Sequence, residues 1–395
     1  MKMGLFFVML LAPLASTVSD ENVSGPQKDP ALEAPPITLS LGPEYGDARR
    51  IFQGIPGIAR TKGGRLWATW YAGGPTEGPE NYVLLVSSRD DGRTWTDPLL
   101  VIDPPGAVRA FDPCLWVDPL GRLWLFWAQA YHHWDGRAGV WAIMTEQAEQ
   151  EAPSWEPPRR LCNGIMMNKP TVLSTGAWLL PVAVWAFPGK GPDERYVHPL
   201  DEESGSNVFC STDEGKTWSM LGQAQVPERR CDEHMIVERR DGSVWMLVRT
   251  KYGIGESVST DGGKTWSPGK PSAIPHVPAA RFFIRRLASG KLLLVRHNPP
   301  KMDQRSHLTA YLSNDEGRTW SGGLVLDERK GVSYPDGVQA PDGTIYIIYD
   351  YSRRGEKMIL MAAFTEEDVA QGVCVSDAAR LRVLVNQATG EKASE

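Results

Sequence analysis

The residues of this sequence that could do chemistry are polar side chains placed shortly before six glycine turns. Glu233 and His234 stand ahead of one turn, and Tyr334 stands ahead of another. The other members of the set are Gln53, Arg109, Asp112, Asn168, Lys169, Asp232, Arg281 and Asp336, while Arg249 and Arg305 follow at strand ends or on the next loop. Arginines bind anions through charge-assisted hydrogen bonds, and carboxylates exchange protons with their neighbours. The pattern predicts an anion pocket that contains a carboxylate pair and a tyrosine.

A sixfold repeat supplies the elements that would bring these residues together. A glycine turn followed by an apolar strand recurs at intervals of roughly 50 to 65 residues, which is the range for propeller blades, beginning at Gly64, Gly121, Gly176, Gly242, Gly290 and Gly343. Short strands between regular turns are typical of the four-stranded blades of a β-propeller. We therefore expect an all-β fold with six blades, in which the segment before each glycine turn is the innermost strand. The candidate residues would then gather at the mouth of the axial channel.

Four octets share the pattern S-x-D-x-G-x-T-W and mark one hairpin in each of four blades. They are Ser88–Trp95, Ser211–Trp218, Ser259–Trp266 and Ser313–Trp320. Aspartate and glycine in this order favour a tight hairpin whose aspartate accepts hydrogen bonds from backbone amides. We expect these Asp-box hairpins to be structural tips at the blade periphery, with no part in catalysis.

The two ends of the sequence predict an exported protein. Residues 1–19 combine an early lysine, an apolar run and small residues, as a signal peptide does, and residues 20–37 form a polar leader. We expect the propeller over residues 38–368 and a C-terminal tail over residues 369–395, with a capped helix starting at Thr365. The sequence leaves open whether the leader strand or the tail closes the ring. The protein would be secreted or periplasmic, without membrane insertion.

Composition limits the partners. The formal net charge of −6 argues against nucleic acid and anionic membranes as partners. The five cysteines are scattered without the spacing of metal ligands, so we expect no metal and no cofactor. The oligomeric state stays open.

The octets on a sixfold β pattern resemble the sialidase (neuraminidase) superfamily over nearly all of residues 38–368. The run that begins DEHMIVERRDG resembles the family segment in which a glutamate precedes a strand ending in a triad arginine, which implies Glu233 and Arg249. QRSHLT resembles the segment with the third triad arginine, which implies Arg305, and YPDGV has the spacing of the nucleophilic tyrosine, which implies Tyr334.

The same resemblance implies a retaining exo-glycosidase of the exo-α-sialidase type that acts on a terminal acidic sugar of a glycan. Glu77 falls where the family places its acid/base aspartate, and Glu80 and Asp112 are the competing carboxyls. Arg109, Asp112, Lys169 and His234 are expected to bind substrate. A neutral tyrosine suits a substrate with a carboxylate on its anomeric carbon, because a carboxylate nucleophile would be repelled. Glu233 would have to take the proton of Tyr334.

One position departs from the family. Where relatives open blade one with R-I-P, whose arginine heads the triad, this chain has Gly54-Ile55-Pro56. Two family arginines would remain, which predicts poor hydrolysis of ordinary sialosides and a preference for another acidic sugar. Arg50, Arg109 or Lys169 could compensate from another direction.

Two other functions fit the same residues. A propeller polysaccharide lyase would use His234 or Tyr334 as a base and arginines to neutralise a uronate. A carbohydrate-binding propeller without chemistry would explain Gly54 as the decay of an active site.

Overall fold

The computed structural model describes residue 1 and residues 28–131, 136–185, 201–275, 278–301 and 304–391. The signal peptide (apart from Met1) and the first part of the leader lie outside these ranges, so both stay predictions. Within the described ranges, no helix is long and apolar enough to cross a membrane.

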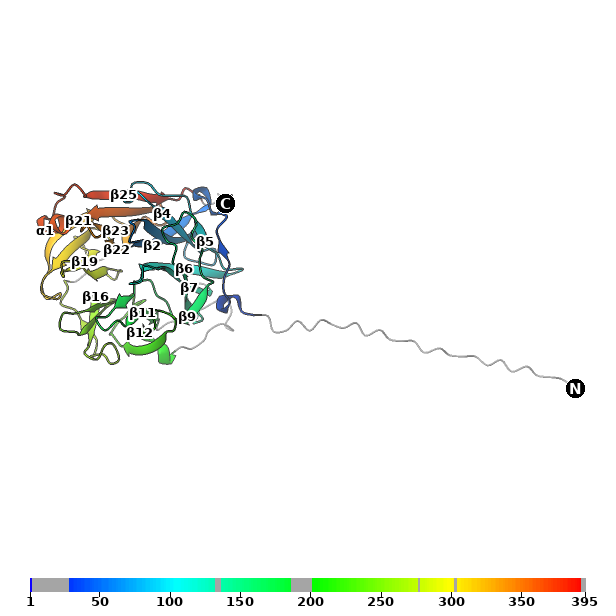
Figure 1. Ribbon diagram of the computed structural model, residues 1–395, viewed down its shortest axis with the longest axis horizontal. Coiled ribbons are helices and arrows are strands. Elements are labelled where there is room, and N and C mark those ends of the chain that lie inside the picture. The colour runs from blue at the N-terminus through cyan, green and yellow to red at the C-terminus, as the bar shows by residue number, and fades with distance from the viewer. Residues whose placement is uncertain (2–27, 132–135, 186–200, 276–277, 302–303, 392–395) are drawn as a thin grey trace.

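Six antiparallel sheets surround a common axis and form the all-β, six-bladed propeller that the repeat predicts (Figure 1). Blade one contains β2 (Phe52–Arg60), β3 (Leu66–Gly73), β4 (Tyr82–Ser88) and β5 (Leu100–Ile102), with β1 (Ile37–Thr38) added outside β5. Blade two contains β6 (Val108–Val117), β7 (Leu123–Tyr131), β8 (Gly139–Thr145) and β9 (Arg159–Asn163). Blade three contains β10 (Thr171–Val172), β11 (Trp178–Val184), β12 (Gly205–Ser211) and β13 (Ser219–Ala224).

The second half of the ring repeats this arrangement. Blade four contains β14 (Met235–Glu238), β15 (Val244–Thr250), β16 (Gly253–Ser259) and β17 (Lys270–Pro271). Blade five contains β18 (Phe283–Arg286), β19 (Leu292–His297), β20 (Leu308–Ser313) and β21 (Ser321–Asp327). Blade six contains β22 (Val332–Gln339), β23 (Ile345–Tyr351), β24 (Met358–Phe364) and β25 (Arg380–Gln387). The helices are short: η1 (Pro30–Leu32), η2 (Pro43–Tyr45), η3 (Asp47–Arg49), η5 (Asp201–Glu203) and α1 (Glu366–Gln371).

The strand before each glycine turn lies at the inner edge of its blade, as predicted. β2 packs against both β6 and β22, and β18 packs against β14 and β22, so these edges meet around the axis. The second strands are almost wholly apolar because neighbouring blades cover both of their faces; β3 and β11 are buried along their full lengths.

Neither terminal strand crosses into a neighbouring blade, which answers the question that the sequence leaves open. β1 widens blade one, and β25 completes blade six, so that blade six continues to Gln387, past the expected boundary at residue 368. Hydrogen bonds join the tail to the start of blade one: Thr389 N donates to Asp47 O at 2.9 Å, and Arg50 Nη2 donates to Asn386 Oδ1 at 2.9 Å. The predicted helix start at Thr365 is confirmed by a capping box with Asp368.

The octets form tight hairpins, each stabilised by its own aspartate. In the last of them the hydroxyl of Thr319 donates to Asp315 Oδ2 at 2.6 Å and the Thr319 amide donates to Asp315 Oδ1 at 2.8 Å. These hydrogen bonds to the charged form lower the pKa of Asp315 to about 2.

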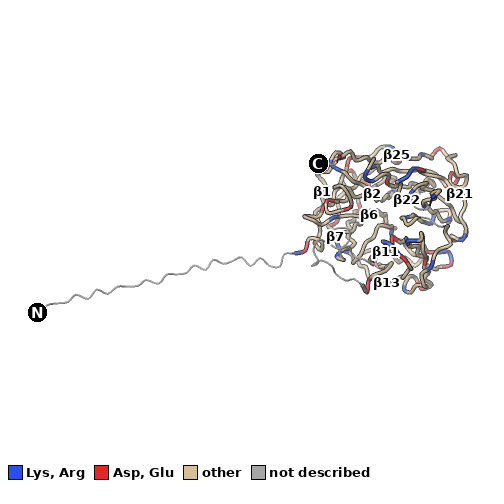
Figure 2. Tube along the Cα trace, turned by 180° about the vertical axis from the view of Figure 1, so that it is seen from behind, with Lys and Arg blue, Asp and Glu red and all other residues tan. Residues whose placement is uncertain are grey.

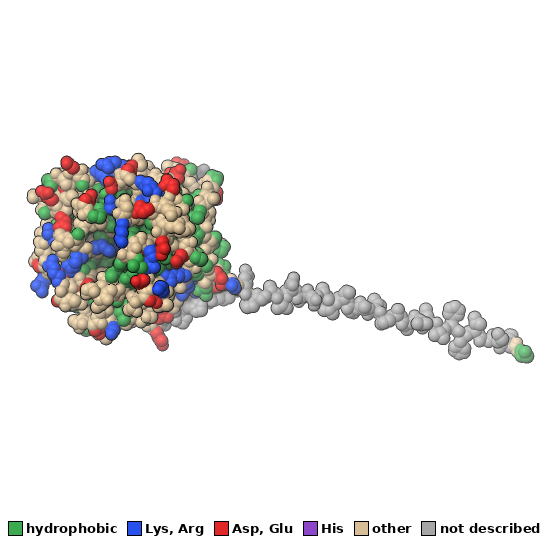
Figure 3. Space-filling view, viewed as in Figure 1, with side chains coloured by type: hydrophobic (Ala, Val, Ile, Leu, Met, Phe, Trp, Pro, Cys, Tyr) green, Lys and Arg blue, Asp and Glu red, His purple; other side chains and the backbone are tan. Residues whose placement is uncertain are grey.

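Blue segments for Lys and Arg and red segments for Asp and Glu are scattered around the ring in Figure 2. On the face shown in Figure 3, basic side chains lie around a hollow near the middle of the molecule, with acidic side chains among them. An anion can therefore be bound locally although the whole chain has a formal net charge of −6.

Candidate functional site

Tyr334, Glu233 and Arg249 meet at one end of the inner strands. The Tyr334 hydroxyl donates to Glu233 Oε1 at 3.1 Å, and Arg249 Nη1 forms an ion pair with the same carboxylate oxygen. Arg249 Nη1 also lies 3.4 Å from the Tyr334 oxygen. Glu233 Oε2 is buried without a hydrogen-bond partner in the described part of the chain. The buried carboxylate of Glu233 thus accepts a hydrogen bond from Tyr334 and is held in place by the ion pair with Arg249.

Backbone bulges orient three of the side chains at this site. The inner strands β2, β6 and β22 each shift register at a residue followed by proline, and these residues are Ile55, Asp112 and Tyr334. Their φ angles are 59°, 49° and 53°, a region that side chains other than glycine rarely adopt. A bulge turns a side chain away from the regular pleat. All three residues line one cavity.

Glu233 is positioned by a different device. The segment that leads into β14 places three consecutive residues, Cys231, Asp232 and Glu233, at φ angles of 56°, 44° and 44°. Conformations of this kind cost roughly 1–3 kcal/mol each and persist where the surrounding structure enforces them, often at functional sites.

The cavity has a volume of about 40 Å³, and its wall includes the side chains of Glu77, Arg109, Asp112, Glu233 and Tyr334. The remaining wall residues are Ile55, Phe111, Met167, Trp185 and Cys231. A volume of this size holds a few water molecules but no sugar ring, so substrate binding requires side chains on the wall to move. Glu80, a competitor of Glu77 in the sequence, is exposed and does not line the cavity.

Two ionisable groups of the cavity have raised pKa values. Burial raises the pKa of Asp112 to about 7, opposed by Arg109 and supported by the negative charges of Glu77 and Glu233. Burial also raises the pKa of Tyr334 above its usual range, and Glu233 adds to this, whereas Arg249, Arg353 and Arg305 lower it. The site therefore holds a carboxyl group that carries its proton at mildly acidic pH beside a tyrosine that needs a base.

Two more guanidinium groups flank the Tyr334 ring. That of Arg305 lies 5.6 Å from the ring centroid, while its Nη1 donates to Ser333 Oγ at 3.0 Å. That of Arg353 lies 5.1 Å from the centroid, and its Nη1 forms an ion pair with Glu77 Oε1 at 2.8 Å.

Lys169 and His234, both expected to bind substrate, do not line this cavity. The ammonium group of Lys169 donates to the carbonyl oxygens of Ile58 and Leu115, at 2.6 and 3.0 Å, and pairs with Asp336. The His234 ring is buried against Asn207 O at 2.9 Å, and burial lowers its pKa to about 4. Both side chains make structural contacts between blades, because a polar residue at the inner edge of one blade can also hydrogen-bond to a neighbouring blade.

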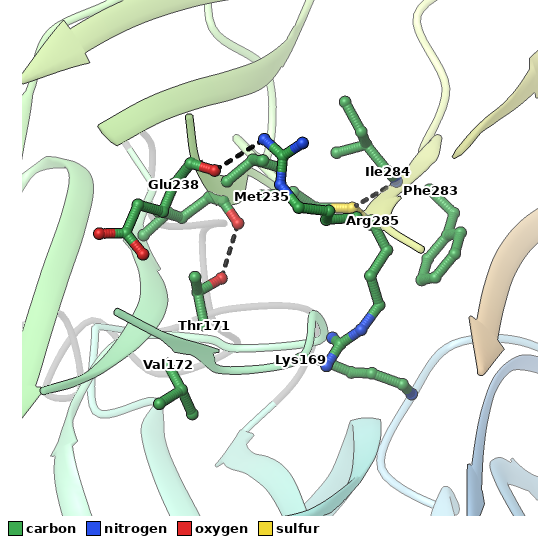
Figure 4. A pocket seen from close by; sticks show the side chains of 11 residues that line it. Lys169, Thr171, Val172, Met235, Glu238, Phe283, Ile284 and Arg285 are labelled. Atoms are coloured by element: carbon green, nitrogen blue, oxygen red, sulfur yellow. Dashed lines mark hydrogen bonds between the residues drawn. The ribbon is translucent and has the colours of Figure 1, made fainter. Parts of the chain in front are cut away.

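Lys169 contributes instead to a larger cavity, of about 230 Å³, between β10, β14 and β18 (Figure 4). Arg285 lies on its wall with Met235 and Phe283. This cavity contains no tyrosine, and Glu238 is its one carboxylate among the described residues. It therefore lacks the paired groups that proton transfer to a nucleophile requires. Within the described ranges, no cluster of His, Cys, Asp and Glu side chains could hold a metal ion.

Comparison with known proteins identifies the family of the chain. Residues 64–347 match the BNR repeat-like domain. The chain belongs to this repeat family within the sialidase superfamily. It is 25% identical over 349 residues to a sialidase of Bacteroides fragilis strain YCH46, a match that covers 78% of this chain and 61% of that protein. An anhydrosialidase of Macrobdella decora is 25% identical over 177 residues, covering 40% of this chain and 23% of that protein. The chain thus spans less than two thirds of these curated relatives.

The fold of the superfamily is also shared by solved structures. The Hadza microbial sialidase Hz136 superposes with a TM-score of 0.64 at 18% identity, covering 82% of this chain and 68% of that one. At this identity the likeness concerns the fold.

Within this sialidase-like site, Arg353 is the residue that the sequence interpretation missed. It lies in the turn between β23 and β24, beyond every segment that resembles a family motif. None of the three cations named as substitutes takes this place: Lys169 binds across the axis, Arg50 binds Tyr45 O and Asn386, and Arg109 lies over the ring of Phe111 at 4.0 Å. The feature of the sequence that could have pointed to Arg353 is the glycine at position 54, because a residue without a side chain there leaves space for Arg353.

Proposed function

We propose that this protein is a retaining exo-glycosidase that removes a terminal acidic sugar from a glycan, with Tyr334 as the nucleophile. One observation carries the proposal: the Tyr334 hydroxyl donates to Glu233 Oε1 at 3.1 Å, on a carboxylate that Arg249 holds by an ion pair. A tyrosine of raised pKa becomes a nucleophile only if a base takes its proton as it attacks. Glu233 is in hydrogen-bond contact to do so.

The reaction would proceed in two displacements. The Tyr334 oxygen attacks the anomeric carbon while its proton passes to Glu233, and the glycosidic oxygen leaves with a proton from an acid. Water then attacks the same carbon and gives one proton to the acid that was deprotonated in the first step, while Tyr334 leaves and recovers its own proton from Glu233, so the configuration is retained. The three arginines around Tyr334 favour an anionic substrate, and a carboxylate beside the anomeric carbon would lie closest to them.

Asp112 is the better supported acid. Its pKa of about 7 keeps it protonated at mildly acidic pH, as a general acid requires. Glu77 forms an ion pair with Arg353, and this contact favours the charged carboxylate over the protonated form that a general acid needs. A sugar carboxylate that approached Arg353 would compete with Glu77 for this guanidinium.

The decisive variant is Tyr334→Phe, which removes the nucleophilic oxygen and leaves the ring. We expect kcat on the best acidic glycoside to fall on the order of 10³-fold or more, with ligand binding largely intact. Tyr346→Phe is the matched control, because its hydroxyl belongs to the same blade but donates to Asp91 at 3.1 Å. Wild-type turnover by Tyr334→Phe would reject the tyrosine nucleophile.

The same assay separates the alternatives. A lyase that uses His234 has little support, because this ring is buried against Asn207 away from the cavity. A lyase that uses Tyr334 as base would release an unsaturated sugar that absorbs in the ultraviolet. A protein that binds acidic glycans without releasing any sugar would be a binding module.

A further inference from the structure

Gly54 is a glycine for reasons of space rather than backbone conformation. Its φ lies outside the left-handed region that favours glycine. A Cβ built at this position would lie 2.3 Å from Arg353 Cδ, 2.6 Å from Arg353 Cγ and 3.0 Å from Asp350 Oδ2. Real Cβ atoms essentially never show contacts as short as the two with Arg353, and the contact with Asp350 is tighter than nine in ten real ones. Any side chain at position 54 would therefore displace the aliphatic part of Arg353.

The side chain of Arg353 crosses this space to reach the nucleophile. Its guanidinium lies 5.1 Å from the centroid of the Tyr334 ring and 6.0 Å from that of Phe52. Asp350 Oδ2 is 3.9 Å from Arg353 Nε and accepts a hydrogen bond from Ile55 N at 2.8 Å. Blade six thus anchors the arginine beside the bulge of blade one.

The guanidinium of Arg353 has capacity left for a ligand. Burial disfavours its charge, but Asp350, Tyr334 and Glu77 together raise its pKa above the usual value, so it stays charged. Its side chain is 22% exposed, and its hydrogen bond to Glu77 uses one of five N–H donors. No other hydrogen bond from this group is found among the described residues.

From this arrangement we infer that Arg353 binds the carboxylate of the substrate, as a third arginine supplied by blade six, and that Gly54 exists to admit it. The inference rests on the proposed function and adds a specificity residue to that site. Gly54 then marks the relocation of a cation rather than its loss. The expected ligand is a pyranose that carries a carboxylate on its anomeric carbon. Arg249, Arg305 and Arg353 would bind this carboxylate.

Binding measurements on a matched pair of probes test the inference without relying on turnover. The probes are the 2,3-unsaturated analogue of N-acetylneuraminic acid and the same molecule with its carboxylate converted to a primary amide. Arg353→Ala should weaken binding of the acid by about 10- to 100-fold, the range for a lost hydrogen bond to a charged group. Binding of the amide should change by less than about threefold. Arg354→Ala is the matched control, since that arginine lies in the same turn and donates to Thr76 Oγ1 at 2.7 Å.

A double-mutant cycle tests the role of Gly54. Gly54→Ala should weaken binding of the acid about as much as Arg353→Ala, because the new methyl displaces Arg353, and the double variant should be no weaker than Arg353→Ala alone. Arg353→Lys should recover part of the affinity, because it keeps the charge without the planar fork. Thermal melting of each variant identifies any that fail to fold, and Arg353→Lys supplies the readout if the alanine variant is among them.

The outcomes are distinct from those of the proposed function. Equal weakening of both probes by Arg353→Ala, additive effects in the cycle, full affinity of Gly54→Ala, or no binding of the acid by the wild-type protein would each overturn the role of Arg353. Failure of the wild-type protein to cleave any acidic glycoside would overturn the glycosidase and leave the binding result standing.

Discussion

At the scale of single residues, the site depends on which groups hold protons. Asp112 is 4% exposed, and its pKa of about 7 places its titration near neutral pH. Glu233, which forms an ion pair with Arg249, lies on the same cavity wall as Asp112, so the proposed reaction has a candidate base and a candidate acid in one place. The raised pKa of Asp112 comes mainly from its burial, and the negative charges of Glu77 and Glu233 add to it.

This assignment predicts the pH dependence. If Asp112 is the acid, kcat/KM should fall as the pH rises through about 7. Asp112→Asn should remove this fall and lower activity by about 10²- to 10⁴-fold on a natural glycoside. The loss should be much smaller on an aryl glycoside whose leaving group needs no protonation. Glu77→Gln is the comparison, and a larger leaving-group effect in that variant would assign the acid to Glu77.

The same group affects stability with a definite sign. The pKa of Asp112 in the folded protein is above the value of an unfolded chain, so between about pH 4 and pH 7 the folded state binds the extra proton. The contribution of Asp112 to stability therefore declines as the pH rises across this window. Asp112→Asn should flatten that part of the unfolding profile.

At the scale of elements, the inner bulges orient side chains into the cavity, whereas the octet hairpins stabilise the blades. The aspartate of an octet, such as Asp315, has a lowered pKa because a threonine donates a hydrogen bond to its charged form. Asp315→Ala should lower the Tm by about 1–3 °C at neutral pH and leave activity at moderate temperature unchanged. Because the pKa of Asp315 is about 2, the stabilisation is present above about pH 4 and is lost as the pH falls toward 2. A melting difference that persisted at pH 2, or a loss of activity, would contradict this role.

The elements also show what the sequence could predict. Six glycine turns at regular spacing were enough to predict the blades and to identify the inner strands, because local turn chemistry fixes both. The sequence also carries a signal for the inner bulges, in the pairs Ile55-Pro56, Asp112-Pro113 and Tyr334-Pro335. Each places a proline after the residue that faces the cavity.

The site was predictable only in part, for a physical reason. Tyr334, Glu233, Arg249 and Arg305 lie together, and the family resemblance identified all four. Sequence cannot say whether a polar residue at an inner edge faces the cavity or a neighbouring blade, which is why Lys169 and His234 were expected in the site. Arg353 approaches Gly54 across 299 positions of sequence, a contact that no local pattern encodes.

At the scale of the whole molecule, the seam between blades one and six joins the site to the closure of the ring. Ile55 stands on β2 and Tyr334 on β22, the two inner strands that meet there. Behind them, Asn386 Oδ1 accepts hydrogen bonds from Arg50 Nη2 at 2.9 Å and Gln53 Nε2 at 3.0 Å. Arg50 is fully buried, so a lost partner leaves a charged group incompletely bonded.

We therefore expect Asn386→Ala to lower the free energy of unfolding by about 1–3 kcal/mol, the cost of leaving buried donors without their acceptor. The seam also holds Tyr334 next to the contact between Gly54 and Arg353. The kcat of Asn386→Ala should therefore be lower than that of the wild-type protein, even at temperatures where the variant remains folded. Gln387→Ala is the control: its side chain is on the same strand but donates at 3.2 Å to Glu356 O outside the seam. Denaturant unfolding and kinetics on both variants decide the matter. Equal effects of the two substitutions, or a destabilised Asn386→Ala with unchanged kcat, would show that closure of the ring and geometry of the site are independent.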